Sequence, residues 1–108
     1  MPSIGIVKYD ETTDAYAGEL RTLSIRAKLQ LLPVRKTRDS QPDYRILSED
    51  VEVGAAWKRV STTSGNEYLS LSIAAPAFGR RKLFANLGRA AGQDDPSVYA
   101  IIWNTDDE

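Results

Sequence analysis

The chain has 108 residues, carries 14 Lys and Arg against 15 Asp and Glu, and contains neither His nor Cys. Its length suits one domain with a single core. The two missing residue types exclude disulfides, thiol nucleophiles, metal sites with Cys or His ligands, and imidazole as a general base. We therefore expect a protein that is not an enzyme and that uses no cofactor and no metal.

Apolar and polar residues alternate along most of the chain, which is the pattern of strands with one buried face. In chain order, the first clear example is residues 24–32. Here Ile25, Ala27, Leu29 and Leu31 fall on one face, and polar residues fall on the other. The alternation predicts that this apolar face is buried.

Three later segments follow the same rule. Residues 51–58 place Val53 and Trp57 on one face, which we expect to pack in the core. In residues 67–74, Leu69, Leu71 and Ile73 share one face, which we expect to be buried. Both faces of residues 98–103 are apolar, which is typical of a strand covered on both sides.

Turn-forming residues separate these segments. Ser64-Gly65-Asn66 predicts a hairpin, because Gly and Asn tolerate positive φ. Residues Leu83 to Ala91 can form a short helical turn, and Gly88 argues against a longer helix. About seven strands are predicted, near residues 3–9, 15–23, 24–35, 43–48, 51–61, 67–74 with 82–87 following, and 98–104.

Short, regularly spaced strands favour an all-β fold with little or no helix. We expect a single small antiparallel barrel or sandwich, with an OB-like barrel among the options. The β domain spans residues 1–104, and residues 105–108 form an acidic C-terminal tail. The apolar stretches fall far short of the roughly 20 residues that cross a bilayer, and residues 1–10 hold no signal-peptide pattern. The sequence thus predicts a cytoplasmic protein without membrane contact.

The net charge of −1 conceals an uneven distribution along the chain. Residues 1–19 carry a net charge of −3, residues 20–93 carry +7, and residues 94–108 carry −5. Lys and Arg neutralise phosphates, and exposed aromatic rings stack on bases. The basic middle, with its interleaved aromatic residues, therefore indicates a nucleic-acid-binding surface.

Within that basic middle, seven Lys and Arg residues are expected to contact phosphates. Tyr44 and Tyr68 are expected to stack on bases, because alternation places at least one of them on a polar face. The two Trp and two Phe residues are interpreted as core. The basic residues can instead serve only solubility and the blocking of edge pairing. The candidate site comprises Arg26, Lys28, Tyr44, Lys58, Arg59, Tyr68, Arg80, Arg81 and Lys82.

Several stretches resemble an uncharacterised family, a domain of unknown function found in small proteins of plasmids and integrative conjugative elements of alphaproteobacteria. They are PDYRIL at residues 42–47, VGAAWKR at 53–59 and EYLSL at 67–71, extended by residues 4–5, 18–23 and 85–87. The sequence departs from the family at the basic run GRRK, residues 79–82. The resemblance implies a compact β domain carried by mobile DNA, and it implies no activity and no catalytic residues.

Two functions remain open from the sequence. The first is non-catalytic binding of nucleic acid, most simply single-stranded DNA or RNA with little sequence preference. The alternative is a protein-interaction or inhibitory accessory module of a mobile element, which docks on a host or transfer protein through strand edges or its acidic ends. A homodimer is compatible with either function.

Overall fold

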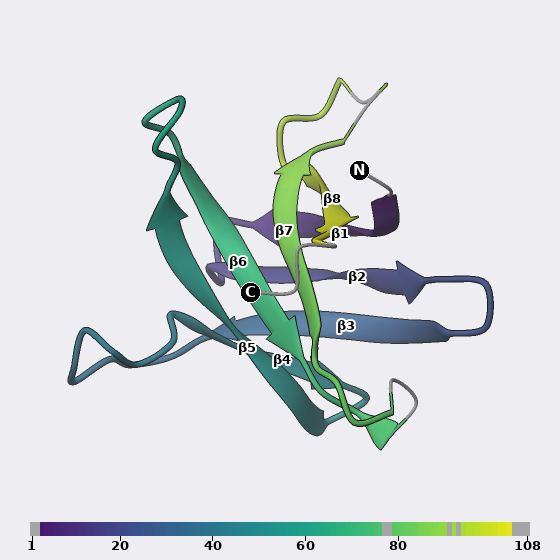
Figure 1. Ribbon diagram of the computed structural model, residues 1–108. Coiled ribbons are helices and arrows are strands. Elements are labelled where there is room, and N and C mark those ends of the chain that lie inside the picture. The colour runs from purple at the N-terminus through teal and green to yellow at the C-terminus, as the bar shows by residue number, and fades with distance from the viewer. Residues whose placement is uncertain (1–2, 77–78, 91, 93, 105–108) are drawn as a thin grey trace.

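The fold is a closed antiparallel barrel (Figure 1). The computed structural model describes residues 3–76, 79–90, 92 and 94–104. Each strand pairs with the next along the chain, and the last strand pairs with the first. The strands are β1 (Ser3–Asp10), β2 (Ala15–Arg21), β3 (Arg26–Pro33), β4 (Tyr44–Ser48), β5 (Val51–Val60), β6 (Glu67–Ile73), β7 (Leu83–Arg89) and β8 (Val98–Trp103).

This architecture confirms the prediction of a small all-β barrel and gives it eight strands. The strand order is a simple meander, so the fold is neither a sandwich nor the five-stranded Greek-key barrel of OB domains. The strand predicted near residues 82–87 is confirmed, and the alternative of a short helical turn from Leu83 does not occur in the described residues 83–89. Leu83, Ala85 and Leu87 alternate inward, and pairing of this segment with β6 and β8 makes it strand β7.

Other local predictions are confirmed. The β5–β6 connection is a hairpin, closed by the Ser61 amide donating to the Asn66 carbonyl at 2.9 Å, and Gly65 has φ +76°. No helix able to cross a bilayer occurs in the described part of the chain. The predicted acidic tail, residues 105–108, lies outside the described residues, as does Phe78.

The inward faces of the strands form one apolar core. Leu29, Leu31 and Leu71 are buried as their alternation predicts. Burial of such side chains provides the main force that closes the barrel. The largest fully buried side chains are Leu20, Leu31, Ile46, Leu71, Ile73, Ile101 and Val7.

Strand β5 follows the prediction only in part. Val53 packs against the core as expected, but the face around Trp57 is opposite to the prediction. Ala56 is fully buried, whereas Trp57 is only half-buried and lies on the outer face. Ala56 lies opposite Tyr44. A Cβ on Gly54 would lie 2.0 Å from the Ser72 carbonyl oxygen, so the backbones approach closely there. Small residues of β5 thus make room for large side chains of neighbouring strands, and hydrophobicity alone does not decide which face points inward.

The other predicted core aromatics differ as well. Trp103 is 41% exposed at the end of β8, so the expectation that it is a core residue is wrong. Phe84 is half-buried. The physical reason is position, because Trp103 lies at the last pair of the β7–β8 ladder, opposite Ala85, at an end of the barrel.

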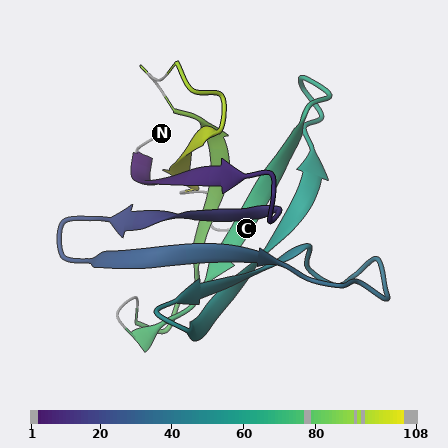
Figure 2. The ribbon, with the colours of Figure 1, turned by 180° about the vertical axis from the view of Figure 1, so that it is seen from behind.

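The barrel has two ends that differ in chemistry. The connections 11–14, 34–43 and 61–66 and the described residues between β7 and β8 meet at one end, which we call the tyrosine end. The connections 22–25 and 49–50 and the described residues between β6 and β7 lie at the opposite end. In Figures 1 and 2 the β2–β3 hairpin and the β6–β7 connection lie on the other side of the molecule from the β5–β6 hairpin.

Candidate functional site

Four tyrosine rings gather at the tyrosine end. Tyr16 lies at their centre, with its ring centroid 4.8 Å from that of Tyr9, 5.5 Å from Tyr44 and 5.7 Å from Tyr99. Tyr9 and Tyr16 are direct partners of the β1–β2 pair, and closure of the barrel places β8 beside β1. The tilted and edge-on contacts are the arrangements that aromatic rings prefer. We call these four residues the tyrosine cluster.

Asp14 fixes two members of the cluster. Its Oδ1 accepts hydrogen bonds from the hydroxyls of Tyr9 and Tyr44, both at 2.8 Å. The backbone of Asp14 is left-handed, with φ 53°, a conformation that Asp tolerates better than most residues. The hydrogen bond from Tyr9, then that from Tyr44 and the nearby charge of Lys58 lower the Asp14 pKa. An ionised carboxylate therefore sits among the rings at neutral pH.

The hydroxyls of Tyr16 and Tyr44 are held neutral. Burial raises the pKa of Tyr16 to about 12, and the neighbouring Tyr99 contributes further. Burial and the hydrogen bond to Asp14 also raise the pKa of Tyr44. Tyr16 and Tyr44 therefore present neutral rings rather than phenolates at any physiological pH.

The raised pKa of Tyr16 predicts an alkaline loss of stability. A group whose folded pKa lies above its unfolded value of 10.0 contributes stability below pH 10, and loses it as pH rises through about 12. Tyr16→Phe should therefore flatten the fall of the unfolding free energy between pH 10 and 12. Urea midpoints at several pH values measure this. Any pH dependence of the unfolding free energy that remains in the variant comes from other groups, Tyr44 among them. An unchanged pH dependence would contradict the conclusion that Tyr16 causes part of it.

Beside the cluster, the structure forms an open pocket of about 490 Å³. Its lining includes the aromatic residues Tyr16 and Tyr99 and the buried Leu69 and Leu87. The pocket is lined by Tyr16, Lys58, Asn66, Glu67, Tyr68, Leu69, Leu87, Gly88, Arg89 and Tyr99. It thus combines aromatic faces, an amide and two cationic side chains in one concavity.

The position of Lys58 on the rim is fixed through its backbone. Its amide donates to Asp43 Oδ2 at 2.8 Å, and Asp43 Oδ1 also accepts from Lys36 Nζ at 3.1 Å. The segment 34–43 is thereby tied to strand β5. Lys58 and Arg89 are both exposed, so their charges are available to a ligand.

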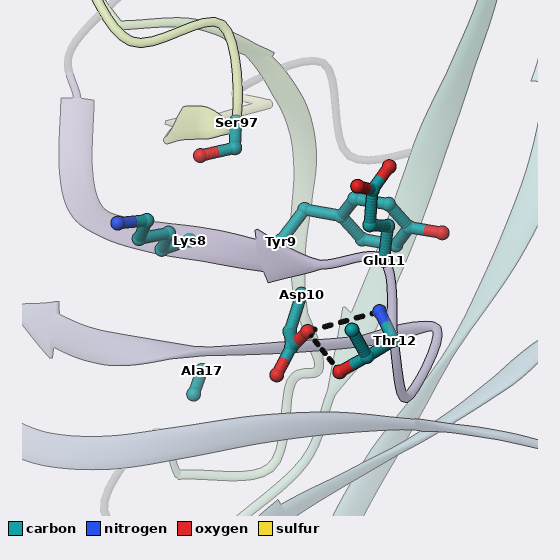
Figure 3. Close-up of a pocket in the computed structure, with 7 residues that line it drawn as sticks. All are labelled: Lys8, Tyr9, Asp10, Glu11, Thr12, Ala17 and Ser97. Atoms are coloured by element: carbon teal, nitrogen blue, oxygen red, sulfur yellow. Dashed lines mark hydrogen bonds between the residues drawn. The ribbon is translucent and has the colours of Figure 1, made fainter.

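A second hollow lies on the outer side of β1 and β2, with a volume of about 840 Å³ (Figure 3). Its polar groups mainly satisfy one another. Asp10 Oδ1 accepts from the Thr12 amide at 3.0 Å and from the Thr12 hydroxyl at 2.6 Å. Lys8 forms an ion pair with Asp95 at 3.5 Å. Because these groups already have partners, we place the candidate site in the pocket beside the tyrosine cluster.

The structure divides the residues predicted for the site. Lys58 and Tyr68 line the tyrosine-end pocket, and Arg59 lies opposite Tyr68 on the neighbouring strand. Lys28 lies on the outer face partway along β3. The remaining basic residues belong to the opposite end of the barrel and do not join this pocket, namely Arg26, Arg80, Arg81 and Lys82.

Tyr44 requires a correction. It is 3% exposed, so the expectation that its ring is an exposed stacking surface is wrong. The reason is that Tyr44 points inward at the start of β4, opposite Ala56, and its hydroxyl is held by Asp14. Tyr68, by contrast, alternates with the buried Leu69 and lies on the outer face. One of the two tyrosines is thus on a polar face, as alternation requires.

Several site residues escaped the sequence reasoning: Tyr9, Asp14, Tyr16, Arg89 and Tyr99. They come from four strands and one turn that are distant in sequence, and no local motif connects them. One signal was present, because Tyr9 and Tyr16 are placed symmetrically about the turn between the first two predicted strands. Facing tyrosines at a hairpin base indicate an aromatic pair on one side of the sheet.

Comparison with known proteins identifies the family. A model described as protein of unknown function (DUF736) matches residues 3–106, so the chain belongs to this family. The membership confirms the resemblance to an uncharacterised family. No curated protein and no solved structure matches the chain.

Proposed function

We propose that the chain is a non-catalytic nucleic-acid-binding domain, which holds single-stranded DNA or RNA in the pocket beside the tyrosine cluster. The observation that carries the proposal is the composition of that pocket. Tyr16, Tyr68 and Tyr99 line it together with Lys58 and Arg89. Single-strand-binding proteins combine these two elements, aromatic faces for bases and cations for the backbone.

The physical roles follow from position. The half-buried rings of Tyr16 and Tyr99 are held by their neighbours, so stacking on them costs little ordering of side chains. Lys58 and Arg89 lie on the rim, where a phosphate could approach without leaving water entirely. Because rings and phosphates carry no base identity, we propose little sequence preference. We also propose the cytoplasmic location and the association with plasmids and conjugative elements that the resemblance implies.

The test is salt-dependent binding of a labelled single-stranded oligonucleotide. We expect binding at about 50 mM salt that weakens steeply towards 200 mM. Lys58→Gln with Arg89→Gln removes two phosphate contacts, so the salt slope should fall by about 1.4, since each contact contributes about 0.7 for single strands. Tyr99→Ala should weaken binding by about tenfold through lost stacking.

The control carries the same charge change elsewhere. Lys28→Gln with Arg45→Gln alters two exposed outer-face residues of β3 and β4 and should leave both affinity and salt slope near the wild-type values. Absence of binding at about 50 mM salt would refute the proposal. Equal losses in the pocket variant and the control variant would refute the assignment to this pocket.

A protein partner is the second candidate, supported by acidic side chains at the same end. Glu67 lines the pocket, and Asp94 and Asp95 are exposed on the connection between β7 and β8. These carboxylates repel phosphates and attract a basic protein surface. Docking through strand edges is not available, because every strand of the closed barrel is paired on both sides. A pull-down that retains one specific host or transfer protein after nuclease treatment would favour this candidate.

A further inference from the structure

The tip of the β2–β3 hairpin exposes a leucine to solvent. Leu23 has a relative exposure of 108%, which is the full exposure of an extended chain. The turn around it is ordered by hydrogen bonds. The Thr22 amide donates to the Ile25 carbonyl at 2.8 Å, and Thr22 Oγ1 accepts from the amides of Ser24 and Ile25 at 3.4 and 3.1 Å. Ile25 packs partly against the core, so the turn directs Leu23 away from the barrel.

Two arginines flank the turn that carries this leucine. Arg21 and Arg26 are cross-strand partners at the end of the β2–β3 pair, and both are exposed. Like charges placed opposite each other destabilise a sheet. Arg21 has a weak partner in Glu19 at 3.4 Å, and Arg26 forms no ion pair within the described residues. A polyanion would relieve this repulsion.

The surroundings of the tip are basic as well. The β6–β7 connection belongs to the same end of the barrel and carries exposed Arg80 and Lys82. In Figures 1 and 2 the β2–β3 hairpin projects beyond the rest of the barrel, away from the β4–β5 turn. The tip is therefore able to enter a groove that the barrel itself could not enter.

We propose that the hairpin tip is a wedge for duplex nucleic acid. Leu23 inserts between adjacent base pairs, and Arg21 and Arg26 contact phosphates on either side of the inserted step. Insertion of an apolar side chain unstacks the step and kinks the duplex, and the energy comes from burying the side chain and from the phosphate contacts. This site lies at the opposite end from the tyrosine cluster and does not depend on the function proposed there.

The chemistry of the tip favours nucleic acid over a lipid surface. Within the tip, Leu23 is fully exposed while Ile25 packs partly against the core, and stable membrane anchoring needs more apolar area than one leucine or a second anchor. Intercalating wedges need only one such side chain, because the base pairs supply the apolar faces. The cross-strand pair of arginines also matches a ligand with discrete, spaced phosphates.

Two probes test the wedge on a duplex of about 20 base pairs with a central, easily unstacked TA step. The adenine analogue 2-aminopurine at that step should brighten when wild-type protein unstacks it, and energy transfer between the duplex ends should report the kink. Leu23→Ser should abolish both signals and weaken binding by about tenfold. Arg21→Gln with Arg26→Gln should lower the salt slope by about 1.8, at about 0.9 per phosphate.

Matched variants separate the outcomes. Val51→Ser changes another exposed apolar residue (63% exposed) outside the tip and should leave both signals intact. Tyr99→Ala should also leave them intact, so failure of the wedge and failure of the tyrosine-end site are distinguishable. Equal signals from wild type and Leu23→Ser would overturn the proposal. So would Leu23-dependent binding to vesicles of phosphatidylcholine and phosphatidylserine with no response from the duplex.

Discussion

Replacing Gly18 with Ala is expected to lower the unfolding free energy by at least about 3 kcal/mol, at the upper end of what overpacking costs. Gly18 lies in β2 between Val7 of β1 and Leu29 of β3. A Cβ at this position would lie 1.9 Å from the Ile6 carbonyl oxygen and 2.6 Å from the Val7 Cα. Both are backbone atoms, so the contact is relieved only by moving β1 away from β2. The barrel would open between these two strands.

The matched control is Gly88→Ala in β7. A Cβ there meets the Ile102 side chain, with Cδ1 at 2.8 Å and Cγ1 at 4.0 Å, and the end of a side chain can rotate aside. We expect this variant to change the unfolding free energy by less than about 1 kcal/mol. Urea unfolding of both variants measures the two changes in unfolding free energy. Similar stabilities for the two variants would show that the close approach of β1 and β2 is not a constraint.

Tyr44→Ala is the second large effect, with an expected loss of about 3–5 kcal/mol, the usual range for removing a buried aromatic ring. The ring of Tyr44 is 3% exposed and packs edge-on against Tyr16. Its hydroxyl also supplies one of the two hydrogen bonds that hold the Asp14 carboxylate. Removal leaves a cavity beneath the cluster and frees one side of Asp14.

Tyr44→Phe separates the ring from the hydroxyl. This variant keeps the packing and loses one hydrogen bond, so we expect a loss of about 1 kcal/mol. Tyr68→Ala, on the outer face, should cost less stability than Tyr44→Ala while weakening oligonucleotide binding. Thermal unfolding ranks the three variants. If Tyr44→Phe were as unstable as Tyr44→Ala, most of the stability contributed by Tyr44 would come from its hydrogen bond to Asp14 and not from burial of its ring.

The strands were predictable because their signal is local. Alternation in residues 24–32 and 67–74 identifies strands and their buried faces without any knowledge of their neighbours, and both faces were correct. The hairpin at Gly65 was predictable for the same reason, since a positive φ constrains the residue itself. These features depend on interactions within a few residues.

The inward face of β5 was not predictable in this way. Val53 packs against the core, but farther along the strand Trp57 is more hydrophobic than its neighbour Ala56. Ala56 nevertheless points inward, because the large side chain of Tyr44 occupies the space opposite it. Which face of a strand can pack inward depends on the side chains of the neighbouring strand as well. The sequence of β5 alone therefore does not determine it.

The sequence by itself determined an all-β chain without His or Cys, with a basic middle between acidic ends. Only the tertiary structure decided where the residues of that basic middle lie. Lys58 lies at the tyrosine end and Arg26 lies at the opposite end, because consecutive antiparallel strands run in opposite directions between the two ends of the barrel. Closure between β8 and β1 then brings Tyr99 next to Tyr16, a contact that depends on long-range pairing.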